Sequence, residues 1–161
     1  QKQPDVILIT SSAVDTALLI QHIRLIDWQV PIYISDWAYT SAFLQTGGRA
    51  VEGAFLAVSY DVNSKTPAVE KFQQDYRERF GAEPNYAAMQ SYEAVLVLAE
   101  ALKQTGGEAQ GLPDALRSIQ DFQGLTAKFS IDPFGDVIRP VYLYQVQGGS
   151  WITLETYLNV K

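Results

Sequence analysis

The 161-residue sequence contains no cysteine and only one histidine, His22. It therefore cannot form disulfides, use a catalytic thiolate, or build a zinc site from cysteines or from several histidines. No apolar run approaches the ~20 residues that a membrane-spanning helix needs. Basic residues are also few, since 12 Lys and Arg against 18 Asp and Glu give a net charge of −6. This balance disfavours nucleic acid or an anionic membrane as the main partner.

Signatures of catalysis and of cofactor binding are missing as well. Ser11, His22 and Asp36 supply the residue types of a catalytic triad, but no G-x-S-x-G sequence surrounds a serine. Asp132 and Asp136 flank a turn that lacks the calcium-loop pattern, and the glycine pairs lack the spacing of phosphate-binding loops. We therefore expect no enzymatic activity, no metal and no cofactor, and a small α/β hydrolase is the least favoured function.

The first third of the sequence has the pattern of an α/β sheet. Apolar, β-branched runs at residues 6–10, 30–34 and 53–59 predict three strands, and the first is expected to be buried on both faces. Helices are predicted between them, at residues 14–27 and 40–45. Alternating strands and helices with short links predict a Rossmann-like, mostly parallel sheet with flanking helices.

The helix predicted at residues 14–27 is amphipathic. Its apolar face is formed at helical spacing by Leu18, Leu19, His22, Ile23 and Ile26. Because His22 lies within this face, we expect it to have a structural or surface role and no part in catalysis.

After Tyr60 the pattern changes to helices followed by strands. Three helices and then three strands are predicted, at residues 67–80, 86–104, 112–119, 125–131, 137–147 and 151–157. Thr66 and Pro67 have the residue types of an N-cap and a first helical position, and Gly81 is typical of a helix end. Gly148–Ser150 is expected to join the last two strands as a hairpin.

Short motifs that encode turns and packing contacts follow one another along nearly the whole sequence. They are, in order, Asp5–Ser12, Val30–Asp36, Ala50–Gly53, Phe72–Pro84, Tyr92–Val95, Phe122–Gly124, Phe134–Asp136 and Pro140–Tyr142. In this order the motifs resemble those of the type I periplasmic binding proteins, Leu/Ile/Val-binding subgroup, the substrate-capturing components of ABC transporters. Residues 72–84 are similar to that family's F-x-x-x-Y-x-x-x-[FY]-G-x-x-P stretch.

The resemblance implies two α/β lobes joined by crossing strands, with a ligand trapped in the cleft when the lobes close. It also implies that this sequence is the C-terminal half of a longer chain. We expect residues 1–58 to form part of lobe 2 and residues 59–125 part of lobe 1. Residues 126–161 are expected to recross the hinge and to end in the β-hairpin.

A binding protein of this kind is expected to be periplasmic or extracellular. Its implied partners are a small-molecule ligand, either a branched-chain or other amino acid or a related amide, and the membrane permease of an ABC transporter. An extracellular ligand-sensing domain of a signalling receptor remains an alternative, because the two roles share one fold.

The N-terminus shows no signal peptide, and a strand begins almost at once, which suggests a mature or truncated fragment. The lobe 1 helices of such a fragment would expose apolar faces, so a dimer of the fragment is a further hypothesis.

Candidate ligand-binding residues follow the first two predicted strands. Ser11 and Ser12 leave the first strand at the carboxyl edge of the sheet, where open α/β sheets bind ligands. Their hydroxyls, or the amides that open the next helix, would bind a polar group, although a helix cap is the simpler role. Asp36, Trp37 and Tyr39 leave the second strand at the same edge.

An ammonium group needs a charge-assisted acceptor, and Asp36 provides one. The resemblance implies that an acidic residue in this loop binds the ligand's α-amino group, in some members one position later, where this chain has Trp37. Trp37, and Tyr39 less strongly, would line an apolar pocket or else pack in the core. By resemblance, Tyr86 would contact the ligand from lobe 1; its alternative role is packing against the hinge.

Overall fold

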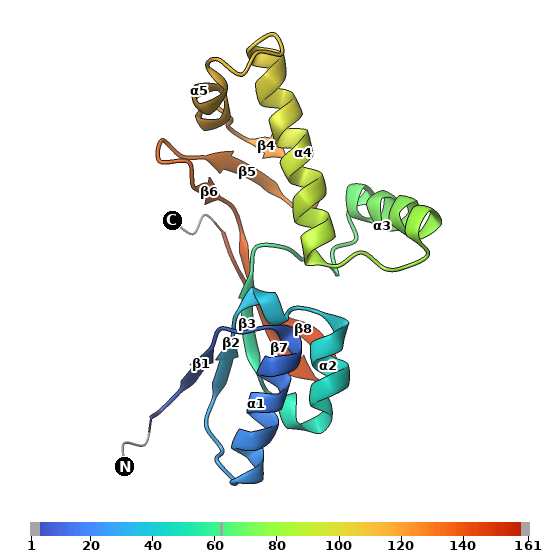
Figure 1. Ribbon diagram of the computed structural model, residues 1–161, viewed down its shortest axis with the longest axis vertical. Coiled ribbons are helices and arrows are strands. Elements are labelled where there is room, and N and C mark those ends of the chain that lie inside the picture. Colours follow the sequence, from blue (N-terminus) through green and yellow to red (C-terminus); the bar gives the residue numbers. More distant parts are fainter. Residues whose placement is uncertain (1–3, 62, 159–161) are drawn as a thin grey trace. The chain divides into compact units, whose positions relative to one another are not determined.

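The computed structural model describes residues 4–61 and 63–158, which separate into two compact units. Unit 1 contains the described residues up to Ser59 together with Val141–Tyr157, and unit 2 contains Tyr60–Pro140. Figure 1 shows the course of the chain, coloured by residue number. The chain therefore passes from unit 1 to unit 2 and back again.

The segment expected to form one hinge-recrossing part, residues 126–161, is divided between the units. Residues 126–140 belong to unit 2 and residues 141–157 to unit 1, and the chain enters unit 2 once more at Leu158. The end of the predicted segment lies outside the described residues.

Unit 1 is built on a five-stranded sheet. Its elements are β1 (Ile7–Ile9), α1 (Ala13–Leu25), β2 (Ile32–Ile34), η1 (Asp36–Ala38), α2 (Ser41–Gly47), η2 (Gly48–Val51), β3 (Phe55–Val58), β7 (Val141–Gln147) and β8 (Ser150–Tyr157). The strand order is β1-β2-β3-β7-β8, with β1 to β3 parallel and β7 and β8 added antiparallel. The expected α/β sheet with flanking helices and a C-terminal hairpin is confirmed (Figure 1).

The two faces of this sheet differ in burial. Leu56 and Tyr144 are paired across β3 and β7, and both are fully buried. Leu8, Tyr33 and Phe55 form a row on the opposite face, where Leu8 is 71% exposed and the rings of Tyr33 and Phe55 stack. The expectation that the first strand is buried on both faces is therefore wrong, because the described residues cover only one face.

Helix α1 buries a different stripe from the predicted one. Thr16, Ala17 and Ile20 are buried, whereas Leu18 is 43% and Ile26 72% exposed. The helix packs against the rest of unit 1 through this buried stripe, so the predicted apolar face points largely away from the core that the described residues form. His22, which lies on that predicted face, is exposed.

Unit 2 combines helices with short strands. Its described elements are α3 (Pro67–Phe80), α4 (Tyr86–Gln104), α5 (Leu112–Arg117), β4 (Phe122–Gln123), β5 (Lys128–Ile131) and β6 (Val137–Ile138). The predicted start and end of α3 are confirmed, since the Thr66 side chain caps it, Pro67 opens it, and Gly81 closes it with a φ of 66°. Two strand predictions were too long: the first begins only at Lys128, and the second divides around Pro140, which lacks an N–H for strand pairing.

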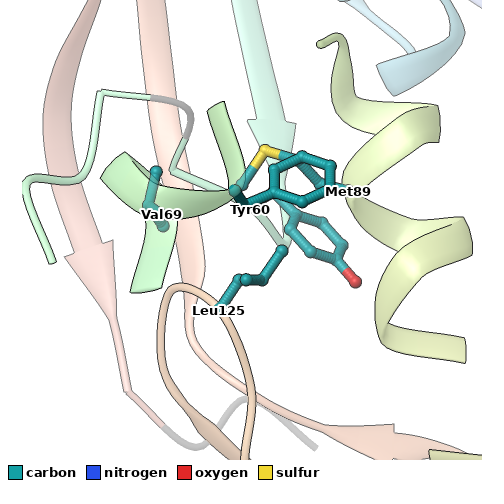
Figure 2. Close-up of a cluster of buried hydrophobic side chains, with 5 residues drawn as sticks. Tyr60, Val69, Met89 and Leu125 are labelled. Carbon is teal, nitrogen blue, oxygen red and sulfur yellow. The ribbon is translucent and has the colours of Figure 1, made fainter. Parts of the chain in front are cut away.

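Two clusters of buried side chains hold unit 2 together. One joins α3 and α4 to the loops around them, through Tyr60, Val69, Phe72, Met89 and Leu125 (Figure 2). The second lies between α4, α5 and β5, and consists of Ala101, Ala115, Ile119 and Ile131. Helix α4 contributes to both clusters and is the central element of the unit.

Candidate functional site

The loops that follow β1 and β2 begin at one edge of the unit 1 sheet. These strands are parallel and in register, with Ile9 opposite Ile34. The amide of Ser35 donates a 3.0 Å hydrogen bond to the carbonyl of Ile9, which ties the start of the second loop to the end of the first strand. The structure therefore brings Ser11 and Asp36 to the same carboxyl edge, as the strand pattern predicts.

Asp36 opens the 3₁₀ turn η1 and is half-buried. Its carboxylate makes no hydrogen bond or ion pair with any residue that the structure describes. The side chain does not cap the turn, because the N-cap is Ser35, which itself forms no side-chain capping bond. The oxygens of Asp36 are thus available to a cationic group from outside the described chain.

Two aromatic residues near Asp36 have different environments. The Trp37 side chain is 65% exposed, so it is not a core residue of unit 1. Tyr39 is only 4% exposed, and its ring packs 5.4 Å from that of Tyr144 and 5.3 Å from that of Trp151. Trp37 is therefore a surface residue of unit 1, whereas Tyr39 is a core residue that packs against other aromatic side chains.

The two serines also differ. Ser12 is the N-cap of α1: its hydroxyl accepts a hydrogen bond from the Asp15 amide at 3.3 Å and donates one to the Asp15 carboxylate at 2.7 Å. The half-buried Ser11 makes no side-chain hydrogen bond within the described residues. Ser12 thus has the capping role, and Ser11 has the free hydroxyl.

Tyr86 belongs to unit 2, where it is the first residue of α4 and half-buried. The Asn85 side chain caps this helix by accepting a 3.0 Å hydrogen bond from the amide of Ala88. Tyr86 thus belongs to a different unit from Ser11 and Asp36, and its contact with a ligand stays a prediction.

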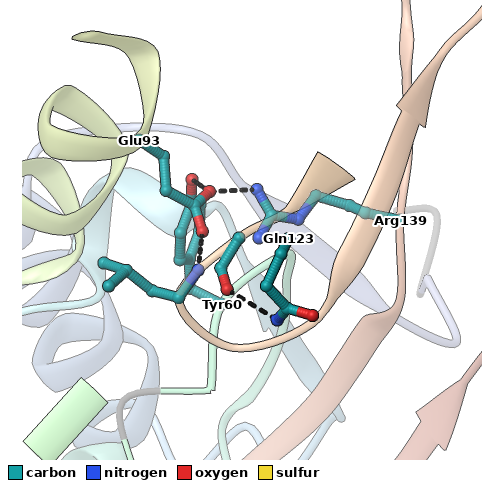
Figure 3. Close-up of polar contacts among 6 residues, drawn as sticks. Tyr60, Glu93, Gln123 and Arg139 are labelled. Carbon is teal, nitrogen blue, oxygen red and sulfur yellow. Dashed lines mark hydrogen bonds and ion pairs between the residues drawn. The ribbon is translucent and has the colours of Figure 1, made fainter. Parts of the chain in front are cut away.

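Sequence reasoning missed a buried polar network in unit 2 (Figure 3). Arg139 and Glu93 form an ion pair of 2.9 Å, with side chains only 8% and 3% exposed. Glu93 also accepts a hydrogen bond of 2.5 Å from the Tyr60 hydroxyl and one of 2.5 Å from the Leu125 amide. Burial and the hydrogen bond to Glu93 raise the pKa of Tyr60 above its ordinary value, so this phenol stays protonated and acts as a donor.

The guanidinium of Arg139 is held between aromatic rings. It lies 4.0 Å from the ring centroid of Tyr60 and 5.0 Å from that of Phe129. Its Nε and Nη2 atoms are buried and have no hydrogen-bond partner among the described residues. The two nearby rings therefore offset part of the free-energy cost of burying the positive charge. The sequence signal was slight, because Glu93 and Arg139 are 46 positions apart.

Gly124 allows the loop before β5 to approach Glu93. A Cβ atom at this position would lie 2.5 Å from Oε1 of Glu93 and 2.8 Å from the Ala127 carbonyl oxygen. This close approach is the physical reason for the glycine in the Phe122–Gly124 motif. A cavity of about 370 Å³ adjoins the network and is lined mainly by apolar side chains of α4 and β5.

Residues 4–61 and 63–158 lack two features that would indicate other functions. No group of three or more His, Cys, Asp or Glu side chains is placed to hold a metal ion. None of the described helices combines the length and the apolar character required to cross a membrane.

The chain is similar to known proteins along nearly all of its length. The family profile for periplasmic binding proteins matches residues 1–150. The leucine-binding protein of Thermotoga maritima is 28% identical, with a TM-score of 0.84, and the match covers 96% of this chain and 45% of that protein.

Two more distant structures share the fold. A branched-chain amino acid binding protein of Streptococcus pneumoniae, in complex with isoleucine, is 21% identical with a TM-score of 0.79, over 97% of this chain and 45% of its own. A solute-binding protein of an R. palustris ABC transporter, in complex with benzoate, is 18% identical with a TM-score of 0.77, over 97% and 44%. This chain thus spans less than half the length of each of these three proteins.

Proposed function

This chain belongs to the periplasmic binding protein family, and from that premise we propose that it forms part of a protein that captures an amino acid for an ABC transporter. The family and the matched structures are those of binding proteins, not of enzymes. The proposal includes a location outside the cytoplasm and a membrane permease as the partner of the loaded protein.

The free carboxylate of Asp36 is the observation that carries the proposal. It lies at the carboxyl edge of the sheet, where open α/β folds bind their ligands, and no described residue neutralises it. A ligand ammonium satisfies such a carboxylate with a charge-assisted hydrogen bond, whereas a ligand carboxylate is repelled. Asp36 therefore favours an amino acid over a simple organic acid such as benzoate.

Trp37 and Ser11 are the other residues of unit 1 that we propose contact the ligand. The exposed indole of Trp37 provides an apolar wall for the ligand side chain, and the Ser11 hydroxyl offers a polar contact. Tyr86 is proposed to contact the ligand from unit 2. Ser12 and Tyr39, whose side chains cap α1 and pack in the core, are proposed to shape the site more than to bind the ligand.

Calorimetry of the full-length protein tests the proposal. The titrants are leucine, isoleucine, glutamate, glutamine and benzoate. We expect at least one amino acid to bind, benzoate to bind more weakly or not at all, and Asp36→Ala to lose the amino acid. Binding of none of the amino acids, or undiminished binding by Asp36→Ala, would contradict it. Asp114→Ala is the matched control, because Asp114 is an exposed carboxylate in unit 2.

A further inference from the structure

A two-residue turn joins the last two strands of unit 1. Gln147 pairs with Ser150, so only Gly148 and Gly149 lie between β7 and β8. Both glycines have positive φ angles, 59° and 72°, as a type I′ turn requires at its two central positions. Because neither residue has a side chain, the sequence of the turn permits this conformation without excluding others. A contact from outside the turn is therefore required to favour one conformation.

The carboxylate of Glu52 supplies this contact. Its Oε2 atom accepts a 3.0 Å hydrogen bond from the amide of Gly148, and its Oε1 atom accepts one of 2.6 Å from the amide of Gly149. Successive amides of a turn form a concave site for an anion, and here a side chain of unit 1 occupies it. The backbone beside Glu52 is also held, since the Gly53 amide donates a 2.9 Å hydrogen bond to the Val146 carbonyl. Glu52 thus joins the tip of the hairpin to the segment that leads into β3.

The register of this hairpin determines the face of the sheet on which Trp151 lies. Trp151 is the second residue of β8 and pairs with Val146, which is buried. The next residue, Ile152, is on the other face and is 41% exposed. Because side chains alternate between the faces of a strand, a slip of one residue would move Trp151 to the opposite face. A contact that fixes the turn therefore also fixes the position of the indole.

The Trp151 indole packs against the loop that carries Asp36. Its ring lies 5.3 Å from that of Tyr39, at an interplanar angle of 80°, and stacks 5.4 Å from the ring of Phe43 in α2. The amide of Tyr39 in turn donates a 2.9 Å hydrogen bond to the carbonyl of Asp36. One aromatic contact and one backbone hydrogen bond therefore connect Trp151 to the residue proposed to bind the ligand ammonium.

We propose that Glu52 is a positioning residue of the binding site: by holding the Gly148–Gly149 turn, it keeps Trp151 against Tyr39 and so fixes the loop that carries Asp36. Glu52 acts through the hairpin and has no proposed contact with the ligand. The hydrogen bonds that carry this role lie within unit 1, whereas the effect on ligand affinity rests on the proposed function.

Three variants of the full-length protein separate this role from an effect of charge. Glu52→Gln keeps the size of the side chain but replaces one acceptor oxygen by an amide nitrogen, which cannot accept. Glu52→Gln/Gly148→Asn stabilises the turn in another way, because Asn-Gly favours type I′ and asparagine tolerates a positive φ. A Cβ atom at position 148 meets nothing within 4 Å. Glu155→Gln removes an exposed carboxylate from β8 itself and is the matched control.

Two measurements need no ligand. In Glu52→Gln we expect hydrogen exchange at residues 148–150 to rise about ten-fold. We also expect the NMR signals of the Trp151 indole N–H, assigned with Trp151→Phe, and of the Tyr39 amide to shift. Both quantities are expected to return to wild-type values in Glu52→Gln/Gly148→Asn and to stay unchanged in Glu155→Gln. Unshifted Trp151 and Tyr39 signals in Glu52→Gln would overturn the connection from the turn to the loop.

Calorimetry gives the third measurement, with an amino acid that the wild type binds. We expect Glu52→Gln to weaken binding about five-fold, because a less ordered loop must be fixed when the ligand binds. Wild-type affinity is expected in Glu52→Gln/Gly148→Asn. Unchanged affinity in Glu52→Gln, or equal losses in it and in Glu52→Gln/Gly148→Asn, would overturn the positioning role. If no amino acid binds the wild type, the proposed function fails, while the two measurements without ligand still test whether Glu52 positions the loop.

Discussion

The amide of Ser35 donates a 3.0 Å hydrogen bond to the carbonyl of Ile9, and this bond joins the loop that carries Asp36 to the strand that leads to Ser11. The position of Asp36 is therefore set by the backbone of two neighbouring parallel strands. Its carboxylate is left without a partner in the described chain, although the backbone around it is held firmly. A charged group that is already fixed in position and has no partner binds a ligand at a lower entropic cost, because little has to be ordered on binding.

Asp36→Asn is expected to weaken amino acid binding by the full-length protein about ten- to a hundred-fold, the loss typical of a charge-assisted hydrogen bond. The asparagine keeps the shape of the side chain, so the melting temperature is expected to stay unchanged. Calorimetry and thermal unfolding measure the two quantities. An equal loss of affinity in Asp114→Asn, which changes an exposed carboxylate of unit 2, would show that the effect is only one of net charge.

Trp37→Ala is expected to affect ligand binding and Tyr39→Ala the stability of the fold, although the two residues are only two positions apart. Trp37 is 65% exposed, so its removal is expected to change the free energy of unfolding by less than about 0.5 kcal/mol but to lower ligand affinity. Tyr39 packs on Tyr144 and Trp151, and its truncation is expected to cost about 3 kcal/mol or more. Denaturant unfolding checks both values. A large loss of stability in Trp37→Ala would show that the indole is a packing residue.

Ser12→Ala is expected to lower the free energy of unfolding by about 1 kcal/mol, because α1 loses the hydroxyl that accepts from the Asp15 amide. Ser11→Ala is the matched control and is expected to leave stability nearly unchanged, since its hydroxyl makes no bond within the described residues. Denaturant titration followed by circular dichroism measures the difference. Equal losses in the two variants would contradict the assignment of Ser12 as the cap.

Local signals in the sequence predict the helices of unit 2 well and its polar network poorly. Thr66, Pro67 and Gly81 act within one turn of the ends of α3, so the residue types alone determine where this helix starts and stops. Glu93 and Arg139 are 46 positions apart and meet only when the chain between them has folded, so no local pattern predicts their contact.

Burial in unit 1 was mispredicted for a related reason. Apolar periodicity shows which side chains are candidates for a core. The sequence around them does not show which element, if any, will pack over them. Leu8 and Ile26 are apolar and nevertheless 71% and 72% exposed. Ser11 and Asp36 follow strands that end at the same sheet edge, as expected, because strand order and direction alone determine which loops share an edge.

Alkaline pH is expected to destabilise unit 2 through Tyr60. Burial, and then its hydrogen bond to Glu93, raise the pKa of Tyr60 in the folded chain above the ordinary value of 10.0. The folded state therefore binds more protons than the unfolded state above that pH, so this contribution to stability is complete below about pH 10 and is lost as the pH rises further. The free energy of unfolding is expected to fall less steeply between about pH 9.5 and 11 in Tyr60→Phe than in the wild type. Tyr76→Phe, in the same unit, is expected to keep the wild-type slope, and a wild-type slope in Tyr60→Phe would contradict the assignment.

The 161-residue chain alone is expected to self-associate, because it exposes apolar surfaces in both units. Leu8, Tyr33 and Phe55 form a row on the uncovered sheet face of unit 1, and Val95 of α4 is 64% exposed in unit 2. Monomeric proteins rarely expose contiguous apolar patches of this kind without a partner. Sedimentation velocity is expected to show a dimer or larger species that dissociates in Leu8→Lys or Val95→Lys. Gln45→Lys adds the same charge at an exposed position of α2 and is expected to leave association unchanged. A wild-type chain that sediments as a monomer at high concentration would show that these faces do not drive association.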